Sequence, residues 1–359
     1  MKQTSQAVAL GVCAGVLALA GLLVFAGCDG AGGGPRSTPS GAAASTVSAV
    51  EASKLREEAL TLLLRASEGG TPEQRANAIE ALIPVPQRLE AVLLRSISDA
   101  NPGVRSVSAM AAGKARLPKL MDACRGMLSD PLPFVQASAI LALGRNGEAV
   151  DPTPLAAMLR SPNPGIRAQA AFVLGELGNA SALPLLKEAA VRPVPRADSA
   201  SARVMYLQLA EAMIKLGDEA AVNEVRAALY PTRPEDLELA ALAAQIIGQV
   251  QDRQAISQLV YLTAFQDKSG NKYPAEVRLA AAASLARLGN ERGSFIADEF
   301  AGSSLAPLRA QSALVYGATG QVDNLSKLAK MLQDPEPLVR IAAAAAVVKI
   351  TDRQGMAGG

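Results

Sequence analysis

Side chains that could carry acid–base or metal chemistry are scarce in this sequence. The 359 residues include no His, so the commonest general base, the commonest metal ligand and any Ser–His or Cys–His nucleophile are missing. Glu235 and Asp236 are adjacent carboxylates in a polar loop, where solvation is their ordinary role. Residues 267–273 offer oxygen ligands at every second position, as a calcium loop does. Lys272 stands where such a loop needs Gly and Arg278 where it needs Glu, so we expect a plain polar loop.

The remaining chemistry-bearing features also argue against catalysis. Cys124 lies at helical spacing with Leu120 and Leu128, which predicts a buried small hydrophobe rather than a reactive thiol. The 35 basic side chains are balanced by 33 acidic ones, whereas a nucleic-acid-binding protein normally shows a basic excess on one face. We therefore predict a protein that is not an enzyme, with no catalytic residue, no metal site, no cofactor and no nucleic-acid partner.

The N-terminus has the features of a targeting segment. Lys2 is followed by an uncharged run over residues 7–27. The run ends in residues 25–28, FAGC, which resemble the bacterial lipobox, although Phe25 departs from the usual Leu. The resemblance implies cleavage before Cys28 and lipidation of that residue. A run of this length also suffices to span a bilayer, so an uncleaved anchor or an ordinary signal peptide is the alternative.

The targeting segment sets the predicted location and the domain boundaries. Each interpretation places the rest of the chain outside the cytoplasm, at the cell membrane, facing the periplasm or the cell exterior. The Gly, Ser, Ala and Pro that follow cannot bury enough apolar surface to fold, and such a tether reaches about 25 Å. The predicted parts are a lipoprotein signal peptide (1–27), the lipidated Cys with a flexible tether (28–53), a repeat solenoid (54–352) and a disordered tail (353–359).

The body of the chain repeats itself. Val104, Val135 and Ile166 begin segments that stand 31 residues apart and superimpose without gaps. Because such repeats stack into one continuous core, they define the fold. Further copies begin at Val277, Leu308 and Val339, and weaker ones at Gln74, Met205 and Leu239. These starts define nine units, of which the last is truncated.

Each unit follows the rules of a helical hairpin. An Asp-Pro or Asn-Pro turn opens it, because Asp or Asn caps a helix and Pro is tolerated only in the first turn. An Ala-rich first helix follows, and the second helix carries Leu at i, i+3 and i+4 spacing. Between them a Gly is expected to end the first helix in the left-handed conformation. These glycines are Gly113, Gly147, Gly178, Gly217, Gly289 and Gly320.

The units resemble HEAT repeats, specifically the short Ala-rich class of the phycobilisome lyases. The resemblance covers about residues 72–352 and implies an all-α, right-handed α-solenoid of about nine helical hairpins. In HEAT families, an Asp in one turn and an Arg at the second position of the next helix stack as a structural ladder. The matching positions are Asp99 with Arg105 and Asp334 with Arg340, Gln136 in place of Arg after Asp130, and Arg75, Arg167, Arg278 and Arg309.

The irregular middle of the chain is where we expect a binding site. Insertions over residues 191–203, 230–236 and 265–276 lengthen three units, and insertions in solenoids map to one edge, often the binding edge. Tyr is favoured at interfaces because it buries much area and keeps a polar tip. Degenerate repeats whose aromatic side chains fill missing Ala volume are the alternative. The predicted partner-binding residues are Tyr206, Tyr230, Arg233, Tyr261, Phe265 and Tyr273.

An anchor, a tether and a solenoid together predict a membrane-tethered, non-catalytic protein-binding scaffold or adaptor in the bacterial cell envelope. Its expected partners are envelope proteins and the membrane, to which a lipid anchor on Cys28 would attach it. Two other functions remain open. One is a lyase-like chaperone or regulatory subunit of an enzyme, and the other is a mechanical spacer.

Overall fold

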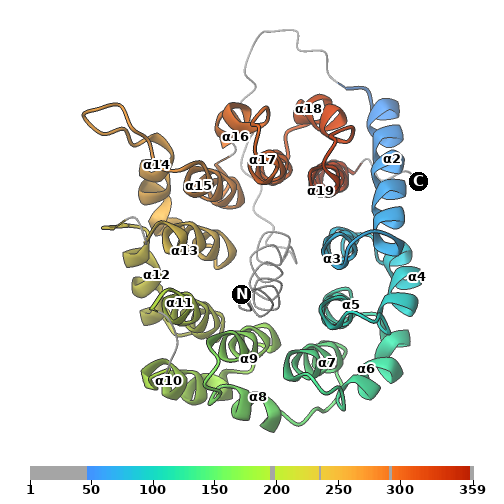
Figure 1. The fold of residues 1–359 in the computed structure, drawn as a ribbon, viewed down its shortest axis with the longest axis vertical. Helices are drawn as coiled ribbons and strands as arrows, with labels where there is room; N and C mark the ends of the chain where they lie inside the picture. The colour runs from blue at the N-terminus through green and yellow to red at the C-terminus, as the bar shows by residue number, and fades with distance from the viewer. Residues whose placement is uncertain (1–46, 195–198, 234–235, 291–292, 356–359) are drawn as a thin grey trace, which may run out of the picture.

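The computed structural model describes residues 47–194, 199–233, 236–290 and 293–355, and within them the fold is all-α. Eighteen α-helices alternate between an inner and an outer layer (Figure 1). The inner helices are α3 (Pro72–Ala81), α5 (Pro102–Lys114), α7 (Pro133–Arg145), α9 (Pro164–Leu177), α11 (Ser199–Lys215), α13 (Leu237–Gln249), α15 (Ala275–Arg287), α17 (Ala306–Thr319) and α19 (Pro337–Arg353).

The outer helices are shorter, except for the first. They are α2 (Ala49–Glu68), α4 (Pro86–Ser96), α6 (Met121–Met127), α8 (Thr153–Met158), α10 (Leu183–Val191), α12 (Val222–Ala228), α14 (Ile256–Ala264), α16 (Ser294–Phe300) and α18 (Asn324–Met331). Single 3-10 turns at Pro118–Leu120, Ala180–Ala182, Glu219–Ala221 and Arg253–Ala255 lead into four of them. None of the helices described here has the length and apolar character needed to cross a membrane.

The solenoid closes into a ring. Each inner helix packs on the next, and the last, α19, packs on the first, α3 (Figure 1). Helix α2 lies against both α19 and α3. It therefore supplies the outer helix that the truncated ninth unit lacks, from the opposite end of the chain.

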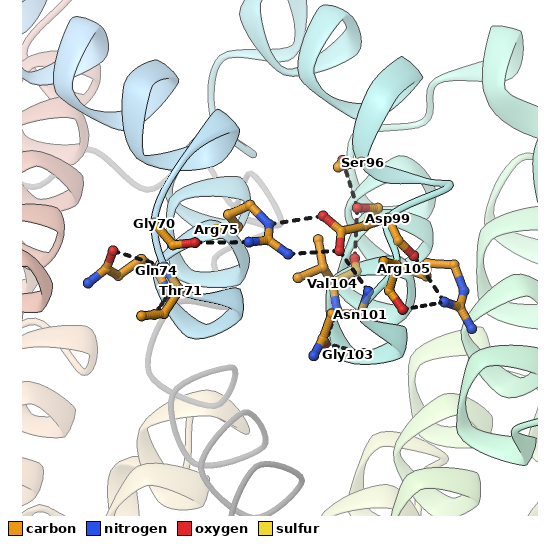
Figure 2. Close-up of polar contacts among 12 residues, drawn as sticks. Gly70, Thr71, Gln74, Arg75, Ser96, Asp99, Asn101, Gly103, Val104 and Arg105 are labelled. Carbon is orange, nitrogen blue, oxygen red and sulfur yellow. Dashed lines mark hydrogen bonds and ion pairs between the residues drawn. The ribbon is translucent and has the colours of Figure 1, made fainter.

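The expected Asn cap and glycine end occur at some of the inner helices, whereas α7 and α19 begin after Leu132 and Glu336 without a side-chain cap. Asn101 accepts hydrogen bonds from the amides of Gly103 (2.9 Å) and Val104 (3.3 Å) at the start of α5 (Figure 2). Gly178 and Gly320 follow α9 and α17 with φ of 72° and 69°, as a left-handed cap requires. Gly147, Gly217 and Gly289 also have positive φ.

The prediction for Gly113 was wrong, because this residue lies inside α5 and Arg116 takes the positive φ (50°) instead. A Cβ on Gly113 would lie 2.8 Å from Cα of Ala142 on α7, so the glycine allows two helix backbones to approach closely. The same contact recurs on alternate inner helices. Its other members are Gly175 against Ala212, Gly248 against Ser284 and Gly317 against Ala346.

Two predicted boundaries shift. Helix α2 begins at Ala49, so residues 49–53 belong to a helix rather than to the tether, because Ser48 and Glu51 form a reciprocal capping box. At the other end Arg353 is the last residue of α19 rather than the first of the tail. The signal peptide, Cys28 and most of the tether lie outside the described residues.

Candidate protein-binding site

The described parts of the three insertions lie on the edge of the ring that carries the connections from outer to inner helices. Each joins an outer helix to the next inner helix, as α14 is joined to α15. The shorter turns of the same edge carry the Asp–Arg ladder. Regular units therefore carry ladder residues in these connections, and the three irregular units carry insertions there.

The ladder links neighbouring units with paired hydrogen bonds. Arg75 donates from Nε (2.9 Å) and Nη2 (2.8 Å) to the carboxylate of Asp99 (Figure 2). Arg105 binds Asp130 in the same way, through Nε (3.0 Å) and Nη2 (2.7 Å). Toward its own turn, Arg105 donates from Nη1 to the carbonyl oxygen of Asp99 (2.9 Å). Each Asp carboxylate thus pairs with the Arg of the preceding unit, and only its carbonyl meets the Arg that follows.

The ladder breaks at Gln136, in a regular unit, and at Arg167, just before the units become irregular. Gln136 reaches only the carbonyl of Asp130 (2.7 Å). Arg167, which is almost fully buried, donates to the carbonyl oxygens of Ser161 (2.6 Å), Arg192 (2.8 Å) and Pro193 (3.1 Å). Burial lowers the pKa of this guanidinium. The side chains at the ladder positions have a structural role, because their N–H groups donate hydrogen bonds to other groups of the fold.

The longest described insertion forms a projecting loop, residues 265–273, which we call the finger. Its shape is fixed by Asp267, whose carboxylate accepts from the amides of Ser269 and Asn271 (both 2.8 Å) and from Asn271 Nδ2 (2.9 Å). The hydrogen bonds from Asn271 hold the pKa of Asp267 below its usual range. A single antiparallel bridge joins Gln266 to Lys272. The finger is thus pre-formed by its own polar groups.

The base of the finger is tied to the neighbouring unit. Arg278 donates to both carboxylate oxygens of Glu299 (2.7 and 2.8 Å) and to the carbonyl of Thr263 (3.2 Å). Lys272 lies 3.5 Å from the same carboxylate. Lys272 and Arg278, the two residues that depart from the pattern of a calcium loop, are thus the cations that pair with Glu299. Across the described ranges, no group of three or more His, Cys, Asp or Glu side chains is arranged to hold a metal ion.

Three of the predicted aromatic residues form one cluster where the finger leaves α14. The ring centroids of Tyr261 and Phe265 are 5.1 Å apart, those of Phe265 and Tyr273 are 5.0 Å apart, and those of Tyr261 and Tyr273 are 6.2 Å apart. Tyr261 is 44% exposed, whereas Phe265 and Tyr273 are half-buried. Burial and the neighbouring Tyr261 raise the pKa of Tyr273. We call these three residues the aromatic cluster.

The other predicted residues lie apart from the cluster. Tyr230 follows α12 and is 52% exposed, and Arg233 in the same connection donates to both carboxylate oxygens of Asp236 (3.1 and 3.2 Å). Tyr206 lies on α11 and packs partly against the core. Val260, which is 41% exposed next to the cluster, was missed because a single Val within a helical period carries no signal of exposure.

A charged network on the inner helices was also not predicted. Lys215 donates to Glu176 (2.8 Å), and Arg145 lies 3.6 Å from the same side chain. Burial alone would raise the pKa of Glu176, but Lys215 and the other cations hold it below its usual value. Nζ of Lys114 and of Lys215 lie 5.4 and 5.5 Å from the ring centre of Phe172. The network joins four inner helices and has charges of both signs.

Cys124 is a free, fully buried thiol, as the spacing predicts. Burial raises its pKa to about 11. Because the thiolate is the nucleophilic form, this cysteine is unreactive at neutral pH.

Sequence families match three parts of the chain. Residues 87–162 match the family described as HEAT repeats, residues 325–353 match HEAT repeat, and residues 166–191 match PBS lyase HEAT-like repeat. These matched segments are HEAT repeats. Such arrays offer extended surfaces to which other proteins bind.

Structural neighbours of the chain are distant. They include an engineered protein (16% identity, 94% of this chain and 98% of that chain, TM-score 0.32). The complex of CpcE and CpcF of phycocyanin lyase from Nostoc sp. PCC7120 is 18% identical, over 74% of this chain and 94% of that chain, with a TM-score of 0.37. Human deoxyhypusine hydroxylase in complex with glycerol is 18% identical, over 78% and 97%, with a TM-score of 0.34. No curated protein sequence matches the chain. At this similarity, the neighbours carry no argument about function.

Proposed function

We propose that this HEAT-repeat protein is a non-catalytic binding scaffold of the bacterial cell envelope, and that the aromatic cluster contacts its protein partner. The observation that carries the proposal is an exposed aromatic surface on a pre-formed projection. Rigid aromatic side chains bury much area and lose little conformational entropy on binding. The hydrogen bonds to Asp267 reduce the ordering cost further, because the finger is fixed before a partner arrives.

The surface around the cluster resembles a small interface core. Tyr261 offers an exposed ring, and half-buried Phe265 packs against it in a tilted arrangement with 5.1 Å between the ring centroids. Val260 extends the apolar area along α14. Lys268 is an exposed cation on the finger itself. A partner with an apolar side chain and an acidic neighbour would complement this arrangement.

The proposed location rests on the sequence before α2. Residues 25–28 support lipidation of Cys28, and the composition of the following residues supports a tether. On this proposal, the ring is held at the cell membrane and faces the periplasm or the cell exterior. Substitution Cys28→Ser tests the anchor: we expect the protein to leave the membrane fraction, and retention with an intact N-terminus would instead favour a spanning anchor.

The binding site is tested by cross-linking and affinity capture from native cells. We expect Tyr261→Ala to reduce recovery of a specific partner at least about tenfold, the scale of a residue worth 1.4 kcal/mol. Phe295→Ala is the matched control, because Phe295 is an aromatic residue of α16 that is 56% exposed outside the cluster. Equal recovery with both variants would refute the site, and no specific partner with any variant would favour a mechanical spacer.

A further inference from the structure

Helix α2 closes the ring as a separable part. It fills the outer position between α19 and α3, which completes the ninth unit with an element from the other end of the chain (Figure 1). Every other outer helix follows its inner partner directly in sequence. The described ring therefore closes without chain connectivity where α19 meets α2 and α3, and α2 is the outer helix at that closure.

The seam has a specific polar latch within an apolar surface. Ala52, Ala59 and Leu63 of α2 have no exposed surface. Nη1 of Arg56 lies 2.7 Å from the carboxylate of Asp352 and donates to Thr351 Oγ1 (2.8 Å). These contacts mean that α19 recognises α2 by side-chain chemistry as well as by shape.

A further polar contact reaches Glu58 of α2, which accepts a hydrogen bond from Gln333 (3.0 Å). This bond comes from the connection that precedes α19, so the latch is not confined to one point of the seam. Both polar contacts pair residues that lie far apart in sequence.

The α2–α19 seam differs in chemistry from the glycine seams of the ring. Burial raises the pKa of the Asp352 carboxyl, against the effect of Arg56, which indicates that desolvation opposes the ion pair. At the α17–α19 seam, by contrast, the helix backbones meet directly at Gly317. Desolvation offsets much of the attraction within a buried ion pair, whereas close-packed backbone carries no such penalty.

Helix α2 also has the properties of an element that survives detachment. It has 20 residues and its own capping box, in which the amide of Ser48 donates to Glu51 (2.9 Å). Isolated helices become marginal below about 12–15 residues, so α2 is long enough to keep helical structure when released. Its link to α3 is a short exposed turn at Gly69 and Gly70, and Gly70 has φ of 86°. This turn is the natural hinge.

We propose that α2 is exchangeable between copies of this chain, so that α2 of one molecule closes the ring of a second and the reverse. The exchanged dimer has the same seam as the closed monomer, twice, around a two-fold axis. Because the contacts are equal, the balance depends on the effective concentration of the molecule's own α2, which is in the millimolar range for a short linker. Closed monomers therefore dominate in dilute solution, and exchanged dimers form where molecules are concentrated.

Charge reversal at the latch tests the exchange. Arg56→Glu places two carboxylates at the seam of one chain, and Asp352→Arg places two cations at the seam of another, so neither variant closes well on itself. When they are mixed, each α2 finds an opposite charge on the other molecule. We expect mixing to raise the dimer fraction in native mass spectrometry at least about tenfold over either variant alone. The double variant in one chain is the control, and we expect it to be monomeric.

The outcomes separate the proposal from a purely internal latch. A monomeric, folded double variant, together with no dimer on mixing the single variants, would overturn the exchange. If the double variant does not fold, the unaltered chain with two different tags is incubated at high concentration. Hybrid molecules that carry both tags then support exchange, and their absence after prolonged incubation refutes it.

Discussion

The close approach of α17 and α19 gives the sharpest test of the packing argument. Gly317 lies near the C-terminal end of α17, and a Cβ there would lie 2.8 Å from Cβ and 2.9 Å from Cα of Ala346. Both atoms belong to a backbone-anchored alanine, so no flexible side chain can move aside. Normal carbon contacts need about 3.5–4.0 Å, so Gly317→Ala must push the helices apart by up to roughly 1 Å.

The expected magnitude is a balance of two terms. Replacing a helical Gly by Ala gains about 0.8–1.0 kcal/mol of helix propensity, whereas overpacking a close contact costs about 1–3 kcal/mol. We expect a net loss of about 0–2 kcal/mol in the free energy of unfolding. Gly126→Ala is the matched control, since this exposed glycine of α6 has nothing within 4 Å of its would-be Cβ. It should gain about 0.5–1 kcal/mol.

The assay is urea unfolding followed by circular dichroism at the helical band, with Ala346→Gly added for a double-mutant cycle. The double variant Gly317→Ala/Ala346→Gly should recover part of the loss, because it restores space at the same contact. If Gly317→Ala and Gly126→Ala stabilise the protein equally, the close approach does not constrain the helices and the reasoning is wrong.

Three further predictions concern charge and reactivity. The hydrogen bonds from Arg309 (both 2.8 Å) hold the pKa of Asp334 below its usual value. The ionised carboxylate therefore stabilises the fold at any pH above its unfolded pKa, and this stabilisation is lost as the pH falls through the folded pKa. Asp334→Asn should therefore lower stability by about 1–3 kcal/mol at pH 7 and make little difference near pH 2, and a pH-independent difference would contradict the ion pair. With Cys13 and Cys28 changed to Ser, Cys124 should react with a thiol reagent at least about 100-fold more slowly in the folded protein than in denaturant, and comparable rates would show that it is accessible. Asp267→Ala should speed hydrogen exchange at the amides of Ser269 and Asn271, whereas calcium should leave the melting temperature of the unaltered protein unchanged; a calcium-dependent rise would restore the calcium-loop interpretation.

Local rules made most of the fold readable from the sequence. Asn101 and Asn163 cap the helices that begin at the prolines after them, and Gly178 and Gly320 end helices with positive φ. These effects involve neighbours within one turn, so residue type and spacing suffice to predict them. The period of 31 residues then locates the hairpins wherever the units are regular.

The candidate site was only partly predictable. Insertions and aromatic residues marked the stretch of chain that contains the finger, but Tyr206 packs against the core while Tyr261, Phe265 and Tyr273 meet at the finger. Exposure depends on which helix face meets a neighbour, and sequence spacing does not fix this in degenerate units. The spacing of ladder residues likewise did not show that Asp99 pairs with Arg75 of the preceding unit.

The sequence by itself determined the repeating hairpin, its caps and the absence of histidine chemistry, because each depends on residue identity over short distances. Tertiary structure alone decided that the array closes, that α2 completes the ninth unit through Arg56 and Asp352, and that Gly113 serves a helix contact rather than a helix end. The physical reason is accumulation. Small rotations at each of the inner-helix contacts add up around the chain, and only their sum brings the first and last units into contact.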